Sequence, residues 1–182
     1  LVSYWALDEA DGNGVVDKVD ETLGSELWDS PASVFTSGTY AWAALGSNAI
    51  SNDSNALKIA YGDNHQGAKL FLSDAADLTD NLVVGTTYKL TFDAKLSNAS
   101  NPNSVWAVAL DDHKVDVTTT DFQSYSIYII ASSTTGNYIR LNGLDSGESC
   151  WLDNLSIKAV NGNPGLMVSF DGSNIVADVP PS

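Results

Sequence analysis

The sequence predicts an all-β protein, built as an antiparallel β-sandwich of the jelly-roll type, on three observations. In residues 87–96 apolar and polar side chains alternate, which buries one face of a sheet and leaves the other in water. Short apolar or alternating runs recur along the chain, separated by turn-rich clusters of small and polar residues. Helical periodicity is almost absent, and residues 74–79 could form at most one helical turn.

The clearest strand begins after a turn at residues 85–87 and carries on one face Tyr88, Leu90, Phe92 and Ala94. Turns are expected at residues 47–55, 97–104 and 132–137, where Asn, Ser and Gly gather. In chain order, the runs that predict strands are residues 1–7, 56–61, 68–72, 87–96, 104–110, 124–131, 138–141 and 150–160.

The composition changes near both ends of the chain. We expect an N-terminal strand and acidic loop at residues 1–24, a central module at 25–160, and a C-terminal extension or added strand at 161–182. Gly162 and Pro164 interrupt the strand pattern and support the second boundary. Because the chain begins with Leu1 and shows no basic, apolar leader, we expect a processed or excised piece of a protein.

The charge of the chain bears on its partners. The formal net charge is −15, from 23 acidic and 8 basic residues. Binding to phosphates needs clustered Lys and Arg, so we expect no nucleic acid and no anionic membrane as a partner. The chain contains no run of eighteen apolar residues, so we expect no membrane insertion. Such acidity suits an extracellular protein, either secreted or on a cell or virion surface, although it also serves plain solubility.

Motifs typical of enzymes are missing. The chain has no Gly-x-Ser-x-Gly, no His-Glu-x-x-His and no phosphate loop, and its one Cys and two His leave few catalytic triads. Glu occurs at positions 9, 21, 26 and 148, which does not predict paired carboxylates on a concave sheet. We therefore predict that the protein is not an enzyme. Cys150 cannot form an internal disulfide and is expected to be buried.

Three segments resemble the jelly-roll carbohydrate-binding modules of families four, nine, sixteen and twenty-two. Residues 84–95 (VGTTYKLTFDAK) resemble the middle of those modules, and residues 151–157 (WLDNLSI) look like their closing strand. Residues 121–129 are similar to a family strand that usually opens with Trp, where this chain has Phe122. The resemblance covers roughly residues 26–160, without the family's opening Asn-Gly-Asp-Phe-Glu signature.

Both ends suggest a second likeness. Residues 1–9 (LVSYWALDE) look like the opening strand of laminin-G-like sandwiches, and residues 170–174 (FDGSN) resemble their second strand. This likeness implies a piece of a modular surface or virion protein.

The resemblance to carbohydrate-binding modules implies that a glycan lies across a concave sheet. Alternation points Tyr128, Tyr138, Arg140 and Asn142 outward, whereas Trp106 points outward in one register and into the core in the other. Aromatic rings offer apolar area to a pyranose, and Arg and Asn offer hydrogen bonds. The predicted ligand-binding residues are Trp106, Tyr128, Tyr138, Arg140 and Asn142. The alternative is that Trp106 is core and the tyrosines only cover a sheet.

Other aromatic and polar residues have simpler expected roles. Trp28, Tyr40 and Trp42 form a second aromatic group, in which Trp42 matches a structural Trp of the family and is expected to be buried. His65 lies on a predicted loop and either lines the rim of a cleft or is solvated.

A structural calcium ion is the expected cofactor. In the family, the Asp that matches Asp153 ligates calcium, together with backbone carbonyls and an acid near the first strand. Calcium takes six to eight oxygens, and Glu9 could supply the second acid if residues 1–9 form that strand. Alternatively, Asp153 is a simple turn acceptor. Residues 9–20 also follow the spacing of an EF-hand loop in part, although an acidic surface turn is the competing interpretation.

These observations favour a non-catalytic carbohydrate-binding module of an extracellular modular protein, which binds polysaccharide or glycan on a concave sheet. Neighbouring modules or subunits are further expected partners. The alternative is a structural virion or cell-surface module that mediates protein–protein assembly, and a hydrolase is a third, less favoured interpretation.

Overall fold

The computed structural model describes residues 22–63, 66–99, 103–108, 113–161, 167–170 and 175–178. The chain divides into two compact units. One unit is Ser25–Ala159, and the other combines Leu1–Gly24 with Val160–Ser182. In the second unit, β12 (Met167–Phe170) and β13 (Ile175–Asp178) pair as an antiparallel hairpin.

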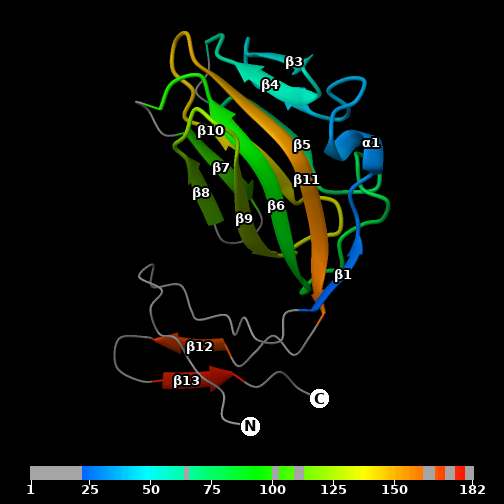
Figure 1. Ribbon diagram of the computed structural model, residues 1–182. Helices are drawn as coiled ribbons and strands as arrows, with labels where there is room; N and C mark the ends of the chain where they lie inside the picture. Colours follow the sequence, from blue (N-terminus) through cyan, green and yellow to red (C-terminus); the bar gives the residue numbers. More distant parts are fainter. Residues whose placement is uncertain are drawn as a thin grey trace. The chain divides into compact units, whose positions relative to one another are not determined.

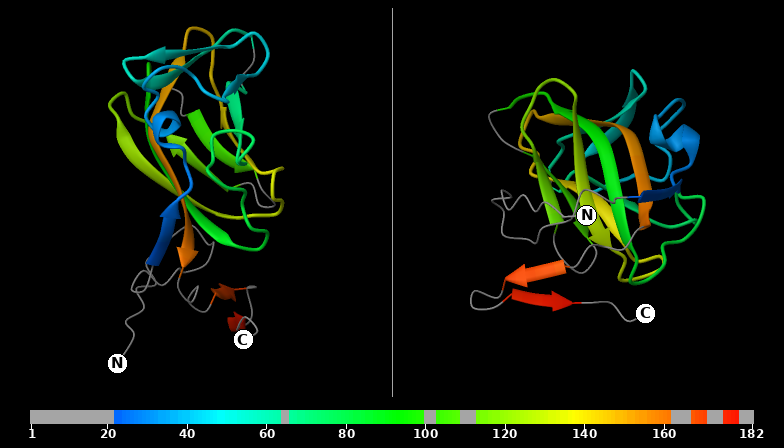
Figure 2. Two further views of the ribbon diagram at one scale, coloured as in Figure 1. Left: turned by 90° about the vertical axis from the view of Figure 1, so that its right-hand side faces the viewer. Right: turned by 60° about the horizontal axis from the view of Figure 1, so that its bottom comes forward.

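The larger unit is a sandwich of two sheets, which can be followed in Figures 1 and 2. The first, here called the β6 sheet, has the strand order β3-β4-β11-β6-β9, and β1 pairs with β11 outside this path. Its strands are β1 (Thr22–Glu26), β3 (Ala49–Asp53), β4 (Ala56–Ala60), β6 (Thr87–Leu96), β9 (Gln123–Ile130) and β11 (Ser149–Asn161).

The second sheet, here called the β10 sheet, has the order β2-β5-β10-β7-β8, with antiparallel pairs throughout. Its strands are β2 (Ala43–Ala44), β5 (Ala68–Phe71), β7 (Asn103–Val108), β8 (His113–Val117) and β10 (Tyr138–Asn142). One short helix, α1 (Ser30–Ser33), precedes both sheets' central strands along the chain. The predicted all-β, antiparallel sandwich is confirmed.

The core lies between the inner faces of the two sheets. Strand β6 alternates without interruption between buried and half-buried residues, as its sequence predicts. The β10 sheet contributes Leu70, Ile139 and Leu141 from the opposite side. Removing these apolar side chains from water is the main favourable term in folding. The largest fully buried side chains include Leu57, Ile59, Leu70, Leu90, Leu96, Ile129, Ile139 and Leu141.

Strand β11 carries an irregularity where it pairs with β6. The register shifts between Asp153 and Ser156, and Asn154 has a positive φ of 50°. Despite this bulge Leu155 stays buried. A β-bulge adds a residue to one strand, which re-aims the side chains that follow it.

Glu26, the last residue of β1, holds this part of β11 in place. Its Oε1 accepts hydrogen bonds from the backbone N–H of Trp28 at 3.0 Å and of Ile157 at 2.8 Å. Its Oε2 accepts a hydrogen bond from the Ser156 hydroxyl. One carboxylate therefore accepts hydrogen bonds from a residue just after β1 and from two residues of β11.

The structure also corrects details of the predicted elements. Residues 74–77 form a turn and not a helix, while the helix of the described residues, α1, lies at a segment for which no helix was predicted. Strand β3 occupies part of a stretch expected to be a turn, and β8 was not predicted. The predicted strand at residues 1–7 lies outside the described residues. Trp42 is buried as expected, with 4% of its surface exposed, and so is Cys150. None of the described helices is long and apolar enough to cross a membrane.

We expect Leu90→Ala to lower the free energy of unfolding by about 2–5 kcal/mol, because a fully buried Leu leaves a cavity in a close-packed core. Urea denaturation of the purified variant measures this loss. Thr91→Ala, at the adjacent outward position of β6, is the matched control and should cost much less. Equal losses in the two variants would contradict the assignment of the two faces.

Candidate functional site

The outward face of the β10 sheet carries most of the predicted ligand-binding residues. Along β10, Ile139 and Leu141 are buried, whereas Tyr138, Arg140 and Asn142 are half-buried and lie on the opposite face. The predicted alternation of this strand is therefore confirmed. Because β10 is the central strand of its sheet, these three residues have neighbours on both β5 and β7.

Phe71 forms an aromatic pair with Tyr138 on this face. The two residues are register partners across β5 and β10, and their ring centroids lie 5.7 Å apart with an angle of 65° between the planes. Phe71 is 42% exposed. Sequence reasoning did not select Phe71, although the alternation of buried Ala68 and Leu70 in β5 already points it outward.

Lys69 lies next to this aromatic pair. Its Nζ is 5.0 Å from the ring centroid of Phe71 and 5.9 Å from that of Tyr138. Ammonium groups at such distances are attracted by the negative face of an aromatic ring. Lys69 is also the register partner of Arg140, so two basic residues stand side by side on this face.

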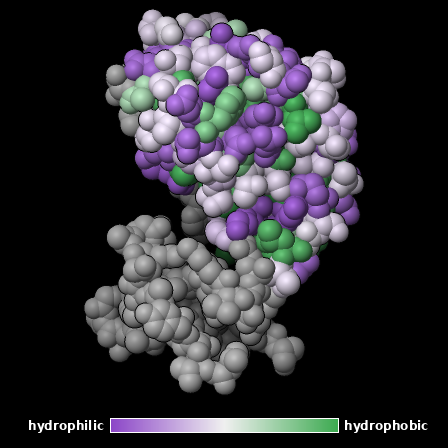
Figure 3. Space-filling model, in the orientation of Figure 1, coloured by the Kyte–Doolittle hydropathy of each residue, from purple (hydrophilic) through white to green (hydrophobic). Residues whose placement is uncertain are grey.

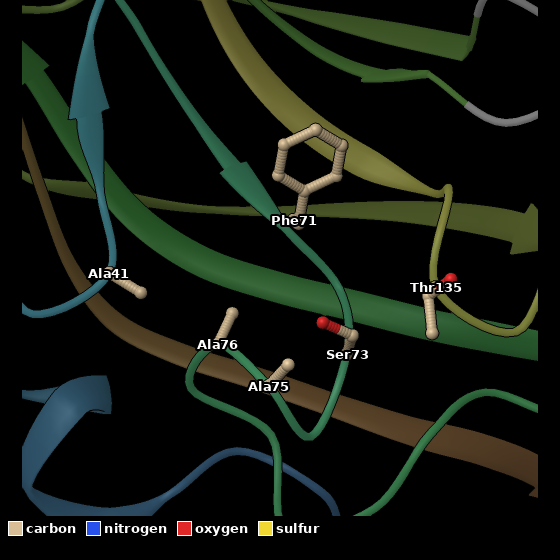
Figure 4. Close-up of a pocket in the computed structure, with 6 residues that line it drawn as sticks. All are labelled: Ala41, Phe71, Ser73, Ala75, Ala76 and Thr135. Atoms are coloured by element: carbon tan, nitrogen blue, oxygen red, sulfur yellow. The ribbon is translucent and has the colours of Figure 1, made fainter.

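A pocket of about 430 Å³ adjoins the Phe71 end of this face. Figure 4 shows the side chains around it, with the Phe71 ring at one end and the small side chains of a loop opposite. Hydroxyl groups of Ser73 and Thr135 add polar atoms to an otherwise apolar lining. The pocket is lined by Ala41, Phe71, Ser73, Ala75, Ala76 and Thr135.

Position 106 belongs to the same face by its register. Trp106 of β7 is the register partner of Arg140 on one side and of Lys114 of β8 on the other. Residues opposite each other in an antiparallel pair occupy the same face of a sheet. The register therefore assigns position 106 to the row of Arg140, while the side chain of Trp106 lies outside the described part of the chain.

Tyr128 is not part of this face. It lies on β9 of the β6 sheet, where the Nζ of Lys89 is 5.3 Å from its ring centroid. The sequence correctly predicts that Tyr128 points away from the core, since it is half-buried between buried Ile127 and Ile129. Alternation along one strand does not say which sheet the strand joins, and this is why Tyr128 was grouped with Tyr138.

The β6 sheet has aromatic residues of its own on its outward side. Trp151 lies between Lys58 and Lys95, each with Nζ 5.1 Å from the ring centroid, and its Nε1 donates a hydrogen bond of 2.9 Å to Asp53. Phe122 is 40% exposed and lies 4.8 Å from the Nζ of Lys95. Figure 3 shows this side of the molecule, where hydrophilic and intermediate residues dominate and hydrophobic residues are scattered.

Asp53 is stabilised as a carboxylate among these groups. Hydrogen bonds from Trp151 and Ser54, together with the charges of Lys58 and Lys95, hold the pKa of Asp53 below its ordinary value. The aromatic–lysine cluster on the β6 sheet therefore contains its own counter-charge.

Asp153, the predicted calcium ligand, lies at the bulge of β11. Its Oδ1 accepts the backbone N–H of Asn154 at 2.8 Å, which is the turn-acceptor role. Burial raises the pKa of Asp153, and the neighbouring Asp93 raises it further. Both Asp93 oxygens accept hydrogen bonds, one from the Ser124 hydroxyl and one from the Asn154 side chain at 2.7 Å.

These groups alone do not complete a calcium site. Calcium takes six to eight oxygens, and the side-chain carboxylates near Asp153 among the described residues are its own and that of Asp93. No group of three or more His, Cys, Asp or Glu that could hold a metal occurs within the described residues. Outside them lie Glu9, residues 9–20, His65, the laminin-G-like segment at residues 1–9 and, apart from Phe170, the one at residues 170–174.

Solved structures share the fold of this chain. The xylan-binding domain CBM22-1 of Xyn10C from Paenibacillus barcinonensis matches with a TM-score of 0.52 and 14% identity, over 78% of this chain and 97% of that one. The C-terminal family 22 carbohydrate-binding module of Xyn10B from Clostridium thermocellum matches with a TM-score of 0.51 and 16% identity, over 84% and 98%. The module CBM1 of BiXyn10A matches with a TM-score of 0.52 and 14% identity, over 76% and 99%.

At these identities the likeness concerns the fold. It agrees with the resemblance to jelly-roll carbohydrate-binding modules found in the sequence. No protein-family model matches the chain, and no curated protein matches it either.

We expect Asp153→Asn to raise the unfolding midpoint at pH 7 in calcium-free buffer. A carboxyl whose pKa is raised by folding loses stability as pH rises through that pKa, so at neutral pH the ionised Asp153 opposes folding. The Asn side chain keeps an oxygen that can accept the Asn154 N–H. Thermal unfolding from pH 7 down to about pH 3, below the ordinary Asp value, should show the difference disappear. A stabilisation that is the same at all pH values would contradict this account.

Proposed function

We propose that this chain is a non-catalytic carbohydrate-binding module that binds polysaccharide on the outward face of the β10 sheet. The observation that carries the proposal is the pair of exposed Phe71 and half-buried Tyr138, flanked by Lys69 and Arg140 and adjoining a pocket. Its support from other proteins is that solved structures with this fold include xylan-binding domains.

The chemistry of this face suits sugars. The C–H faces of a pyranose are apolar and pack on aromatic rings, whose few rotatable bonds cost little entropy on binding. Hydroxyl groups around the sugar need donors and acceptors, which Arg140 and Asn142 supply beside the rings. From Tyr138 to Asn142 the strand spans about 13 Å at ~3.3 Å per residue, which is longer than one pyranose ring. We therefore propose an extended saccharide chain as the ligand.

A binding role without hydrolysis agrees with the residues of this sheet. The strands β2, β5, β7, β8 and β10 contain one acidic residue, Asp116. Glycoside hydrolysis normally uses two carboxyl groups on either side of the scissile bond. We propose that the module recognises its polysaccharide outside the cell, as part of a modular protein whose other parts carry further functions.

We expect Phe71→Ala to reduce binding to xylan, mixed-linkage β-glucan or mannan by at least about tenfold, since truncating a central aromatic residue removes most of a hot spot. Tyr138→Ala should have a similar effect. Affinity electrophoresis identifies the polysaccharide that binds, and isothermal titration calorimetry then measures the loss of affinity.

Phe122→Ala is the matched control. Phe122 is exposed to nearly the same degree as Phe71 and also has a lysine Nζ within 5 Å of its ring, but it belongs to the β6 sheet's side. Its removal should leave binding unchanged.

The proposal would be contradicted if the intact chain bound none of a broad set of polysaccharides and light scattering showed that it self-associates. The alternative role, a structural module that mediates protein–protein assembly, would then be favoured.

We further propose that calcium stabilises the module through Asp153, with Glu9 as a second acid. Calcium at 100 times its dissociation constant should raise the free energy of unfolding by about 2.7 kcal/mol, because it binds the folded state alone. Thermal unfolding with added calcium and with chelator measures the change, and Asp153→Asn should abolish it. An identical midpoint in calcium and in chelator would remove calcium as a cofactor.

A further inference from the structure

The basic residues of this acidic chain are not spread evenly over the β10 sheet. Register pairs join Lys69 to Arg140, Arg140 to Trp106 and Trp106 to Lys114, so one row across β5, β10, β7 and β8 contains three basic residues and a tryptophan. The whole chain has only 8 Lys and Arg against 23 Asp and Glu. With strands about 4.8 Å apart, the row extends over about 14 Å.

We infer that the polysaccharide bound on this face carries carboxylates, as chains containing uronic acid do. The inference rests on the proposed function and names its ligand class. A net charge of −15 repels an anionic chain at long range, and salt screens that repulsion beyond about 10 Å at 0.1 M. Within contact distance the local row of cations decides the interaction, because Coulomb energies rise steeply at short separations.

Lys69 is the residue on which the inference chiefly depends. Among the described residues its contacts are the rings of Phe71 and Tyr138, and no carboxylate lies within ion-pair distance of its Nζ. Aromatic rings position the ammonium group but do not neutralise its charge. A ligand carboxylate next to a sugar ring stacked on Phe71 or Tyr138 would meet that ammonium directly.

The β6 sheet provides an internal comparison. There Lys58 and Lys95 also lie over aromatic rings, but both act on the carboxylate of Asp53, whose pKa they help to lower. On that face one carboxylate therefore lies near two lysines, without forming an ion pair with either of them. Lys69 differs in having a second basic residue, Arg140, as its register partner across β5 and β10.

The other two cations of the row differ in their surroundings. Lys114 lies 3.5 Å from Asp116, and both side chains are about half exposed. Exposed pairs of this kind contribute little and exchange readily with a ligand. Arg140 offers a planar guanidinium, which can bind a carboxylate through two hydrogen bonds. Lys69 and Arg140 are adjacent, so together they suit a negatively charged group better than a neutral hydroxyl.

The experiment compares glucuronoxylan with the same polysaccharide after its carboxyl groups have been reduced to alcohols. Isothermal titration calorimetry should show at least about tenfold tighter binding of the acidic form, and rising salt should remove most of this preference. Lys69→Gln should lose a large part of this preference, and Lys69→Gln combined with Arg140→Gln should bind the two forms with nearly equal affinity. Lys95→Gln, which removes a lysine that lies over aromatic rings of the β6 sheet, should keep the preference. Circular dichroism and the unfolding midpoint confirm that the variants are folded.

The outcomes separate the two proposals. Equal affinity of the intact chain for both polysaccharides would overturn the inference and leave carbohydrate binding in place. A preference that is undiminished in Lys69→Gln, or that disappears in Lys95→Gln, would also overturn it. Equally tight binding of sulfated xylan would show that any anion suffices and would overturn carboxylates as the ligand class. Binding of neither polysaccharide, nor of any other glycan tested, would remove the proposed function itself.

Discussion

The packed interior between the two sheets is the constraint on which the proposed binding face depends. A β-strand sends successive side chains to opposite faces, so burying Ile139 and Leu141 forces Tyr138, Arg140 and Asn142 onto the other side. A shift of one residue in the register of β10 would place the polar set in the core. The arrangement of the outward face is thus held by the hydrophobic effect acting on buried residues of the opposite face.

Lysine–aromatic pairs occur on both outward faces, and their electrostatic surroundings distinguish them. On the β6 sheet, Asp53 accepts a hydrogen bond from Trp151, and the charges of two neighbouring lysines help to lower the pKa of its carboxyl group. On the β10 sheet, Lys69 contacts two rings and has no carboxylate partner among the described residues. Because aromatic rings leave the charge of an ammonium group in place, Lys69 beside Phe71 and Tyr138 can still bind an anion.

Two carboxylates near the bulge of β11, those of Glu26 and Asp153, differ in how fully their charge is hydrogen-bonded. Glu26 accepts two backbone N–H groups and a hydroxyl at the bulge, so its charge is well solvated by the protein. Asp153, the residue of β11 just before the bulge, is partly buried and close to Asp93, and its pKa is raised as a result. Burial of a charge without a full set of partners opposes folding, which is the condition that a bound cation would relieve.

The sequence by itself determined the all-β class, the alternation of β6 and β10, the outward position of Tyr138, Arg140 and Asn142, and the burial of Trp42. The burial of Trp42 was implied by the family resemblance, whereas the other features follow from the two-residue period of a strand, which is a local property. Only the tertiary structure decided that Phe71 and Lys69 join Tyr138, and that Tyr128 belongs to the other sheet. Which strands pair depends on contacts between segments that are distant in sequence. Side-chain alternation within one strand does not predict which other strands will lie beside it.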